Sequence, residues 1–168
     1  MSPDKAREDV MELKFKVSAR IARPVEEVFE AVADPARLSK YFTTGGAVGR
    51  LETGKTVQWD FADFPGAFPV EVVEVESNRR IVIRWEANDG PPEDGSTSAG
   101  QAYMTTVVFT FEPLEDGRTL VSIEESGWRE TPTGLKAAFG NCQGWSQMLA
   151  ALKAWVEHGI NLREGMYV

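Results

Sequence analysis

The sequence has very little of the chemistry that builds disulfide, metal or nucleophile sites. Its 168 residues include one cysteine, Cys142, and one histidine, His158. One cysteine excludes an internal disulfide, and these two residues cannot supply the nitrogen and sulfur ligand sets common at zinc sites. We therefore predict no metal and no cofactor. We interpret His158 as a surface residue of a helix and Cys142 as a packed one, because no histidine lies near it in sequence.

Basic charge and long apolar runs are also scarce. Lysine and arginine total 18 against 26 aspartates and glutamates, so the formal net charge is -8, which argues against a nucleic-acid partner. No run approaches the length of a membrane span, and the first residues lack the apolar core of a secretion signal. We expect a cytoplasmic protein with no membrane partner. The length suits one domain, predicted over residues 14–168 behind a flexible tail over residues 1–13.

The chain does contain long stretches in which apolar and polar residues alternate, as is typical of β-strands. The predicted strands cover residues 15–21, 48–51, 55–61, 68–76, 79–86, 101–112 and 119–127. Two short helices are predicted after the first strand, because Pro24 and the pair Asp34-Pro35 suit helix starts. Short turn sequences between most of the strands favour an antiparallel sheet.

The last long stretch has a helical period instead. From residue 145 onward one apolar stripe is formed by Trp145, Met148, Leu149, Leu152, Trp155 and Val156. This spacing predicts an amphipathic helix, and residues 131–144 either lead into it or form its beginning. A curved sheet wrapped round such a helix encloses space, and enclosed space suggests a ligand.

One motif is typical of a different function, nucleotide binding. Residues 49–56, GRLETGKT, match the phosphate-binding pattern GxxxxGK[ST] letter for letter. That chemistry requires a buried strand before the loop and a helix after it, so that backbone amides cradle the phosphates. Here glycines precede the motif, a strand-like alternation follows it, and Glu52 would repel phosphate. We interpret the motif as a hairpin turn.

Aromatic side chains on the predicted inner faces are the best candidates for a binding site. The candidate ligand-binding residues are Trp59, Phe61, Phe68, Trp85, Tyr103, Thr105, Glu125, Trp145 and Met148. Bulky rings on a curved sheet often line a pocket that holds a few polar groups. The alternative is that these rings only fill the core, as aromatic residues commonly do.

Carboxylates provide the candidate catalytic groups. Glu125 follows Val121 and Ile123 in one alternation, so it should point inward, where Glu125 and Tyr103 could act as acid and base. Glu71 points inward only if its strand is regular, and Arg84 is a candidate partner for a buried carboxylate. The polar loop over residues 87–100 is either a lid or a hairpin tip without function.

The order of elements and two segments carry a family resemblance. The run ARPVEEVFEAVADPARLSKYF over residues 22–42 and the ending GWSQMLAALKAWVEHG over residues 144–159 resemble the START-like superfamily, also called SRPBCC or helix-grip. Within it they are similar to homologues of the activator of the heat-shock-protein-90 ATPase. One departure is Tyr41-Phe42, where such proteins often carry a tryptophan. The resemblance implies an α+β helix-grip fold, with a curved antiparallel sheet of six or seven strands around a long C-terminal helix.

Three functions remain open at this point. The first is a binding protein for a small apolar or aromatic molecule, without covalent chemistry, which we favour because no catalytic set is present. The second, implied by the resemblance, is a cavity enzyme like the polyketide cyclases or hydrolases of the superfamily, with an inward carboxylate. The third is a co-chaperone with a chaperone partner, which rests on resemblance alone. A homodimer through sheet edges or the final helix is also possible.

Overall fold

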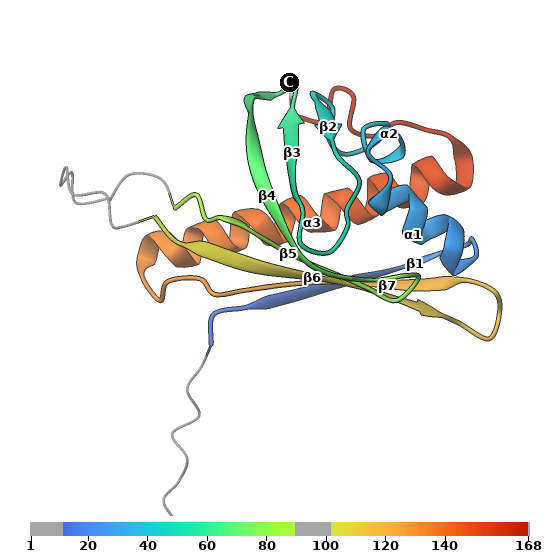
Figure 1. Cartoon of the computed structure of the whole chain (residues 1–168), viewed down its shortest axis with the longest axis horizontal. Coiled ribbons are helices and arrows are strands. Elements are labelled where there is room, and N and C mark those ends of the chain that lie inside the picture. Colours follow the sequence, from blue (N-terminus) through green and yellow to red (C-terminus); the bar gives the residue numbers. More distant parts are fainter. Residues whose placement is uncertain (1–11, 90–101, 168) are drawn as a thin grey trace, which may run out of the picture.

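The computed structural model describes residues 12–89 and 102–167. The elements follow the order β1 (Phe15–Ile21), α1 (Val25–Ala33), α2 (Pro35–Leu38), β2 (Gly46–Val48), β3 (Thr56–Phe61), β4 (Phe64–Glu76), β5 (Arg80–Glu86), β6 (Met104–Pro113), β7 (Thr119–Ser126) and α3 (Pro132–His158). The strands form one seven-stranded sheet in the order β1-β7-β6-β5-β4-β3-β2. Figure 1 shows α3 lying across this sheet. The predicted α+β helix-grip fold is confirmed.

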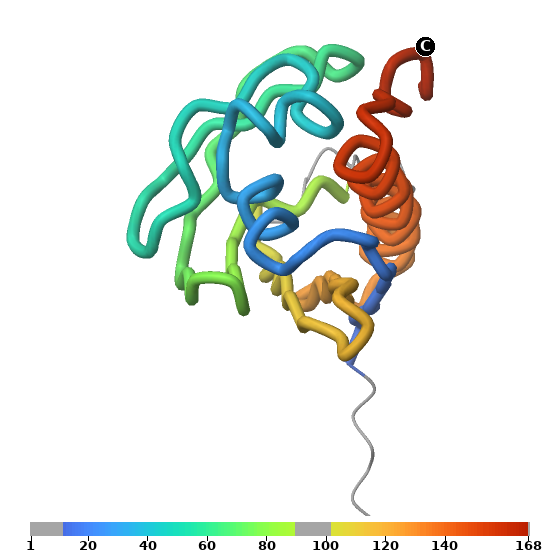
Figure 2. Tube along the Cα trace, turned by 90° about the vertical axis from the view of Figure 1, so that its right-hand side faces the viewer, coloured from blue at the N-terminus to red at the C-terminus, as the bar shows by residue number. Residues whose placement is uncertain are grey.

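Every neighbouring pair of strands is antiparallel. The last strand, β7, pairs with the first strand, β1. Figure 2 looks almost along α3 and shows how strongly the sheet curves. The sheet runs from β1 and β7 beneath the helix, through β5, to β3 and β4 on the far side of α1 and α2. The space between this curved sheet and α3 is where the core and the site lie.

Strand alternation decides which side chains fill that space. On β7, Val121, Ile123 and Glu125 are all fully buried, as their common period requires. The register of β4 against β5 shifts between Val72 and Glu74, which is a β-bulge. Before the bulge Val72 faces the core, so Glu71 is exposed on the outer face, with Arg84 opposite it on β5.

The placement of Glu71 settles a conditional expectation. Glu71 was expected to point inward only if its strand was regular. The strand β4 contains a register shift between Val72 and Glu74, and Glu71 is exposed. Arg84 is likewise exposed and lies across from Glu71, so it is no partner for a buried carboxylate. The outer face of the sheet therefore carries this pair of opposite charges, as solvated sheet faces often do.

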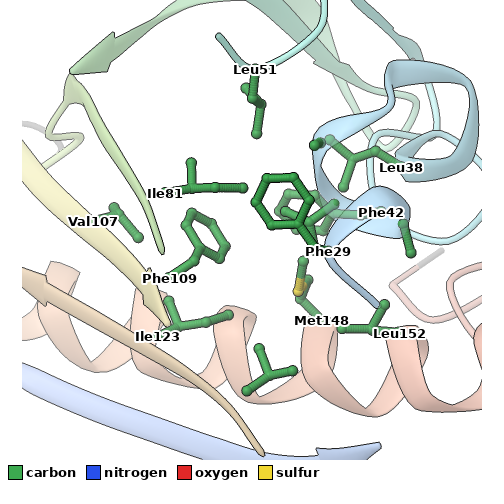
Figure 3. Packing of buried hydrophobic residues seen from close by; sticks show 14 of the residues in the cluster. Phe29, Leu38, Phe42, Leu51, Ile81, Val107, Phe109, Ile123, Met148 and Leu152 are labelled. Atoms are coloured by element: carbon green, nitrogen blue, oxygen red, sulfur yellow. The ribbon is translucent and has the colours of Figure 1, made fainter. Parts of the chain in front are cut away.

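The core joins helix and sheet residues from distant parts of the chain. In Figure 3, Phe29 of α1 lies at the centre, with Phe109 of β6 on one side and Met148 and Leu152 of α3 below it. Phe29 packs edge-on against Phe111 at a ring-centroid distance of 5.3 Å. The predicted apolar stripe of the final helix is thus its core-facing side.

Helix α3 begins at Pro132 and ends at His158, so of the two alternatives residues 132–144 form the beginning of the helix. Thr131 caps it, because its hydroxyl accepts a hydrogen bond from Gly134 N at 3.0 Å, and Pro132 follows at the first helical position. Some predicted strand boundaries were wrong: strand β4 starts at residue 64 rather than 68, and β2 covers residues 46–48 rather than 48–51.

The phosphate-loop motif is followed by a strand, as predicted. Strand β3 begins at Thr56, immediately after the motif's lysine, and Lys55 pairs with Glu52 at 2.9 Å. No helix start is therefore available there to bind phosphate.

Two predictions fall largely outside the part of the chain that the structure describes. These are the flexible tail over residues 1–13 and the lid over residues 87–100. Among the described helices, none is long and apolar enough to cross a membrane.

Candidate functional site

A cavity of about 680 Å³ lies between α3 and the inner face of β3 to β5. Seven aromatic residues line it: Phe42, Phe61, Phe64, Phe68, Trp85, Trp145 and Tyr167. The other lining residues are Pro69, Glu86, Ala87, Asn88, Gly140, Asn141, Gln143, Gly144, Gln147, Met148, Arg163 and Met166. The size and the mostly apolar lining, with few polar groups, are those of small-molecule sites.

Five of the rings contact one another in a closed circuit around this space. Phe42 lies 5.0 Å from Phe61, which stacks on Phe68 at 5.7 Å, where all distances are between ring centroids. Phe68 lies 5.8 Å from Trp85. Trp145 completes the circuit, at 5.4 Å from both Trp85 and Phe42. These are the spacings of favourable aromatic pairs, so each ring fixes the position of the next.

The wall contributed by α3 carries two glycines one turn apart, Gly140 and Gly144, on either side of Asn141. A Cβ atom built on either glycine meets nothing within 4 Å. Glycine inside a helix costs about 1 kcal/mol relative to alanine. The helix therefore accepts two unfavourable residues where side chains would project into open space.

The segment after α3, residues 160–167, closes one side of the cavity, and we name it the C-terminal strap. Its Arg163 pairs with Asp63 in the turn between β3 and β4, with both guanidinium nitrogens 2.9 Å from the two carboxylate oxygens. Both side chains are only 9% exposed. The guanidinium also lies over the rings of Phe61, at 5.6 Å, and Tyr167, at 4.4 Å. This bidentate pair fixes the strap to the sheet.

Behind the cavity wall lies Glu125, which is fully buried. Its Oε2 accepts hydrogen bonds from Trp85 Nε1 at 3.0 Å and Thr105 Oγ1 at 2.7 Å. Its Oε1 accepts one from Trp145 Nε1 at 2.8 Å. The amide nitrogen of Asn141 donates to both oxygens, at 3.1 and 3.2 Å. Because an ionised carboxylate only accepts hydrogen bonds, four donors around it suit the charged form.

The Glu125 network holds the edges of two cavity tryptophans. Both indole N–H groups point to one carboxylate, so neither ring can rotate without leaving a buried polar group unsatisfied. No lysine or arginine of the described residues forms an ion pair with Glu125. The hydrogen-bond partners of Glu125 given above are therefore all neutral groups.

The structure brings five of the nine candidate ligand-binding residues to the cavity. They are Phe61, Phe68, Trp85, Trp145 and Met148. Trp59 lies beneath them, 1% exposed and edge-on to Phe42 and Trp85. Thr105 and Glu125 lie behind the wall, joined by their hydrogen bond.

Tyr103 lies away from the cavity, just before β6 begins. Its hydroxyl donates to Asp89 Oδ1 at 2.7 Å and accepts from the backbone nitrogen of Arg129 at 3.2 Å. The guanidinium of Arg129 lies 4.3 Å from the ring centroid. Burial raises the pKa of the Tyr103 hydroxyl. Tyr103 and Glu125, the two candidate catalytic groups, thus face different surroundings and do not share a cleft.

Sequence reasoning missed several lining residues. Asn141 and Gly144 lie in the part of α3 where the apolar stripe is interrupted, and their spacing on one helix face was the available signal. Arg163 and Met166 come from the strap, which has no periodic pattern. Phe42 was not among the candidate ligand-binding residues, although it forms part of the aromatic circuit.

The remaining polar candidates lie elsewhere. His158 is exposed at the end of α3, and Cys142 is a free, half-buried thiol on the same helix. Within residues 12–89 and 102–167, no three histidine, cysteine, aspartate or glutamate side chains gather closely enough to hold a metal ion.

Solved structures with the same fold are numerous. Protein SSP2350 from Staphylococcus saprophyticus is 25% identical, with a TM-score of 0.71 over 90% of this chain and 96% of that one. DynU16, a protein of the dynemicin biosynthetic locus, is 25% identical, with a TM-score of 0.69 over 87% of this chain and 48% of that one. The Aha1 dimer from Colwellia psychrerythraea, solved in solution, is 23% identical, with a TM-score of 0.66 over 88% and 98%.

Sequence comparison points the same way as the fold. No curated protein matches this chain. The model of one family, described as Activator of Hsp90 ATPase homolog 1-like protein, matches residues 22–157. That range begins just before α1, stops one residue short of the end of α3 and includes most of the cavity wall. With the sheet order, the long closing helix and this match in place, the chain belongs to the Activator of Hsp90 ATPase homolog 1-like family, within the START-like fold.

Proposed function

We propose that this protein binds a small apolar or aromatic molecule in the cavity between α3 and the sheet. The observation that carries the proposal is the cavity wall itself. A cavity of about 680 Å³, partly open to solvent, is lined by seven aromatic residues and by a helix face without side chains at Gly140 and Gly144. Concave and mostly apolar cavities of this size are typical of small-molecule binding sites.

The wall is also rigid before any ligand arrives. Each ring of the circuit touches two others, and Glu125 fixes the edges of Trp85 and Trp145. A site that is already ordered binds with a smaller entropic cost than one that must assemble. Planar ligands suit it best, because stacked and edge-on ring contacts are available on several sides.

The alternative of a cavity enzyme has less support from the geometry. A general acid or base must reach the reacting group directly or through one water molecule. Glu125 does not line the cavity, and its oxygens are engaged by four donors. We assign it to holding the wall. A co-chaperone role and a homodimer remain predictions; the Colwellia relative is itself described as a dimer.

A thermal-shift screen tests the proposed function. Purified protein is heated with a panel of aromatic, sterol, fatty-acyl and polyketide-like compounds, with ATP as the control for the phosphate-loop motif. A ligand at 100 times its dissociation constant stabilises the native state by about 2.7 kcal/mol. For a domain of this size we expect the melting temperature to rise by about 5–10 °C.

The pattern of the shifts decides the outcome. A selective rise with one class of apolar or aromatic compounds supports the proposal and gives the class to assay for turnover. A flat panel on well-folded protein contradicts it and directs the search to protein partners. A shift with ATP alone contradicts both the proposal and our interpretation of the motif.

A further inference from the structure

We propose that the cavity recognises aromatic molecules that carry a ring hydroxyl, and that the side-chain oxygen of Asn141 accepts the hydrogen bond from this hydroxyl. The inference rests on the proposed function, because it names the chemical class of the ligand for the same cavity. It is carried by the position of one amide on α3 and by the carboxylate that orients it.

Asn141 belongs to the side of α3 that faces the cavity. It lies one turn before Trp145 and two turns before Met148, on the same helix face, and all three residues line the cavity. Its neighbours on this wall, Gly140 and Gly144, have no side chains that would cover the amide. Asn141 is itself half-buried. The amide is therefore a polar group set among the rings of the wall.

The carboxylate behind the wall decides which end of this amide is left for a ligand. The Asn141 nitrogen donates to both oxygens of Glu125, at 3.1 and 3.2 Å. An ionised carboxylate only accepts hydrogen bonds, so a flipped amide would place its own oxygen against the carboxylate oxygens and lose both contacts. Glu125 is itself held by the indoles of Trp85 and Trp145. The orientation of the amide is thus set by a buried network.

The donors of this wall are engaged, whereas the amide oxygen is not. Trp85 Nε1, Trp145 Nε1 and Asn141 Nδ2 all donate to Glu125. No donor within residues 12–87 and 102–167 reaches Asn141 Oδ1. Among the described residues, the buried side-chain atoms without a partner are the indole nitrogens of two other tryptophans, so Oδ1 is not sealed inside the protein. The wall offers a ligand an acceptor.

A ring hydroxyl suits both the aromatic side chains and this acceptor. The circuit of five rings provides stacked and edge-on contacts for a planar ligand. A hydroxyl at the edge of the ligand's ring adds one donor without interrupting those contacts. A molecule of the same shape without the hydroxyl would cover Oδ1 and leave it unpaired, which is costly in an apolar surrounding.

Three naphthalene derivatives test the inference by equilibrium dialysis against the purified protein. 2-Naphthol carries the donor, 2-methylnaphthalene has nearly the same shape without it, and 2-methoxynaphthalene keeps the oxygen without its hydrogen. A hydroxyl costs more to remove from water than a methyl group, unless it finds a partner in the site. We therefore expect 2-naphthol to bind the wild-type protein at least as tightly as 2-methylnaphthalene.

Asn141→Leu removes the amide and keeps nearly the same shape. We expect the ratio of 2-naphthol to 2-methylnaphthalene affinity to fall about tenfold, because the hydroxyl then meets no acceptor. The ratio of 2-methoxynaphthalene to 2-methylnaphthalene affinity should not fall, since the methoxy oxygen cannot donate. Asn141→Ala, which adds no bulk, is measured as a second variant with the same expected result.

Gln58→Leu is the matched control for the loss of an amide. Gln58 is exposed on β3 between the buried Val57 and Trp59, so its side chain lies on the outer face of the sheet. This variant should leave both affinity ratios unchanged.

Glu125→Gln tests how the amide is held. A glutamine at this position can present either its oxygen or its NH₂ group, so it no longer holds the amide of Asn141 in one orientation. We expect the ratio of 2-naphthol to 2-methylnaphthalene affinity to fall at least about threefold, a loss that weaker packing alone would not produce because it affects both probes. An unchanged ratio in the folded variant would overturn the orienting role of Glu125.

The outcomes separate this inference from the proposed function. A ratio of 2-naphthol to 2-methylnaphthalene affinity that stays the same in Asn141→Leu and Asn141→Ala overturns the inference and leaves the apolar cavity function standing. A fall in the methoxy ratio as well also overturns it, because the amide would then act as a donor. If none of the three probes binds while another class in the thermal-shift panel does, only the inference fails. If the panel is also flat, the proposed function fails with it.

Discussion

Glu125 illustrates what single residues contribute to this site. The side chain is fully buried and accepts hydrogen bonds from two indoles, one hydroxyl and one amide. Removing a charge from water is costly unless such donors replace the lost solvation. The carboxylate therefore depends on its neighbours, and the positions of the two tryptophan edges depend on the carboxylate.

Glu125→Gln measures this dependence. The substitution keeps the shape but replaces one acceptor oxygen by a donor NH₂ group, which then faces another donor. We expect the free energy of unfolding to fall by about 1–3 kcal/mol, the cost of a buried unsatisfied group. The measurement is the midpoint and slope of urea unfolding.

The matched control is Glu124→Gln on the opposite face of the same strand, where we expect a change within about 0.5 kcal/mol. Equal stability of Glu125→Gln and the wild-type protein would show that the network around Glu125 does not hold the wall.

The inward position of Glu125 could be predicted, whereas its partners could not. Strand alternation alone places it beside Val121 and Ile123 on the buried face. Asn141 reaches it from a helix that follows a separate connection, and no local pattern encodes that meeting. The predicted position of Tyr103 at the cavity differs from the structure. The strand was predicted to begin at residue 101, whereas β6 begins at Met104, and the Tyr103 hydroxyl contacts Asp89 instead of lining the cavity.

At the scale of elements, α3 carries both the core and the site. Its C-terminal half has the apolar stripe from which the helix was predicted, and Leu149 and Leu152 of that stripe are buried. Its N-terminal half lacks the stripe because that face lines a cavity, with glycines and an amide in place of apolar side chains. Because this half of the helix lacks an apolar stripe, periodicity alone could not locate the start of α3.

Gly144→Ala tests whether the glycine that lines the cavity lowers the free energy of unfolding. The added Cβ meets nothing within 4 Å, so only the helix propensity changes, and we expect a gain of about 1 kcal/mol in the free energy of unfolding. Chemical denaturation of the variant and the wild-type protein measures it.

Gly134→Ala provides the opposite case on the same helix. There a Cβ would lie 2.0 Å from the backbone oxygen of Arg129, so this variant should lose stability. A loss of stability in Gly144→Ala as well would mean that the space beside Gly144 is not open in solution.

At the scale of the whole molecule, the antiparallel sheet and the order of elements along the chain are the best-predicted features. Turn sequences and alternation favour an antiparallel sheet, and the helical period identifies the closing helix. The strap could not be predicted in the same way, because the Arg163–Asp63 pair joins residues 100 positions apart in the chain. No sequence pattern near either residue indicates that the two pair, yet this pair fixes the strap that closes one side of the cavity.

The central claim is that the ligand lies inside this cavity, and Gly144→Leu tests it most directly. The compound that gives the largest thermal shift is titrated calorimetrically into the wild-type protein, Gly144→Leu and the control Ala150→Leu, which places the same leucine side chain on the exposed side of α3. Filling the cavity should weaken binding at least about tenfold, or about 1.4 kcal/mol, while the control binds normally. Equal affinity in all three proteins, with Gly144→Leu fully folded, would contradict the account, because the ligand would then bind outside the cavity.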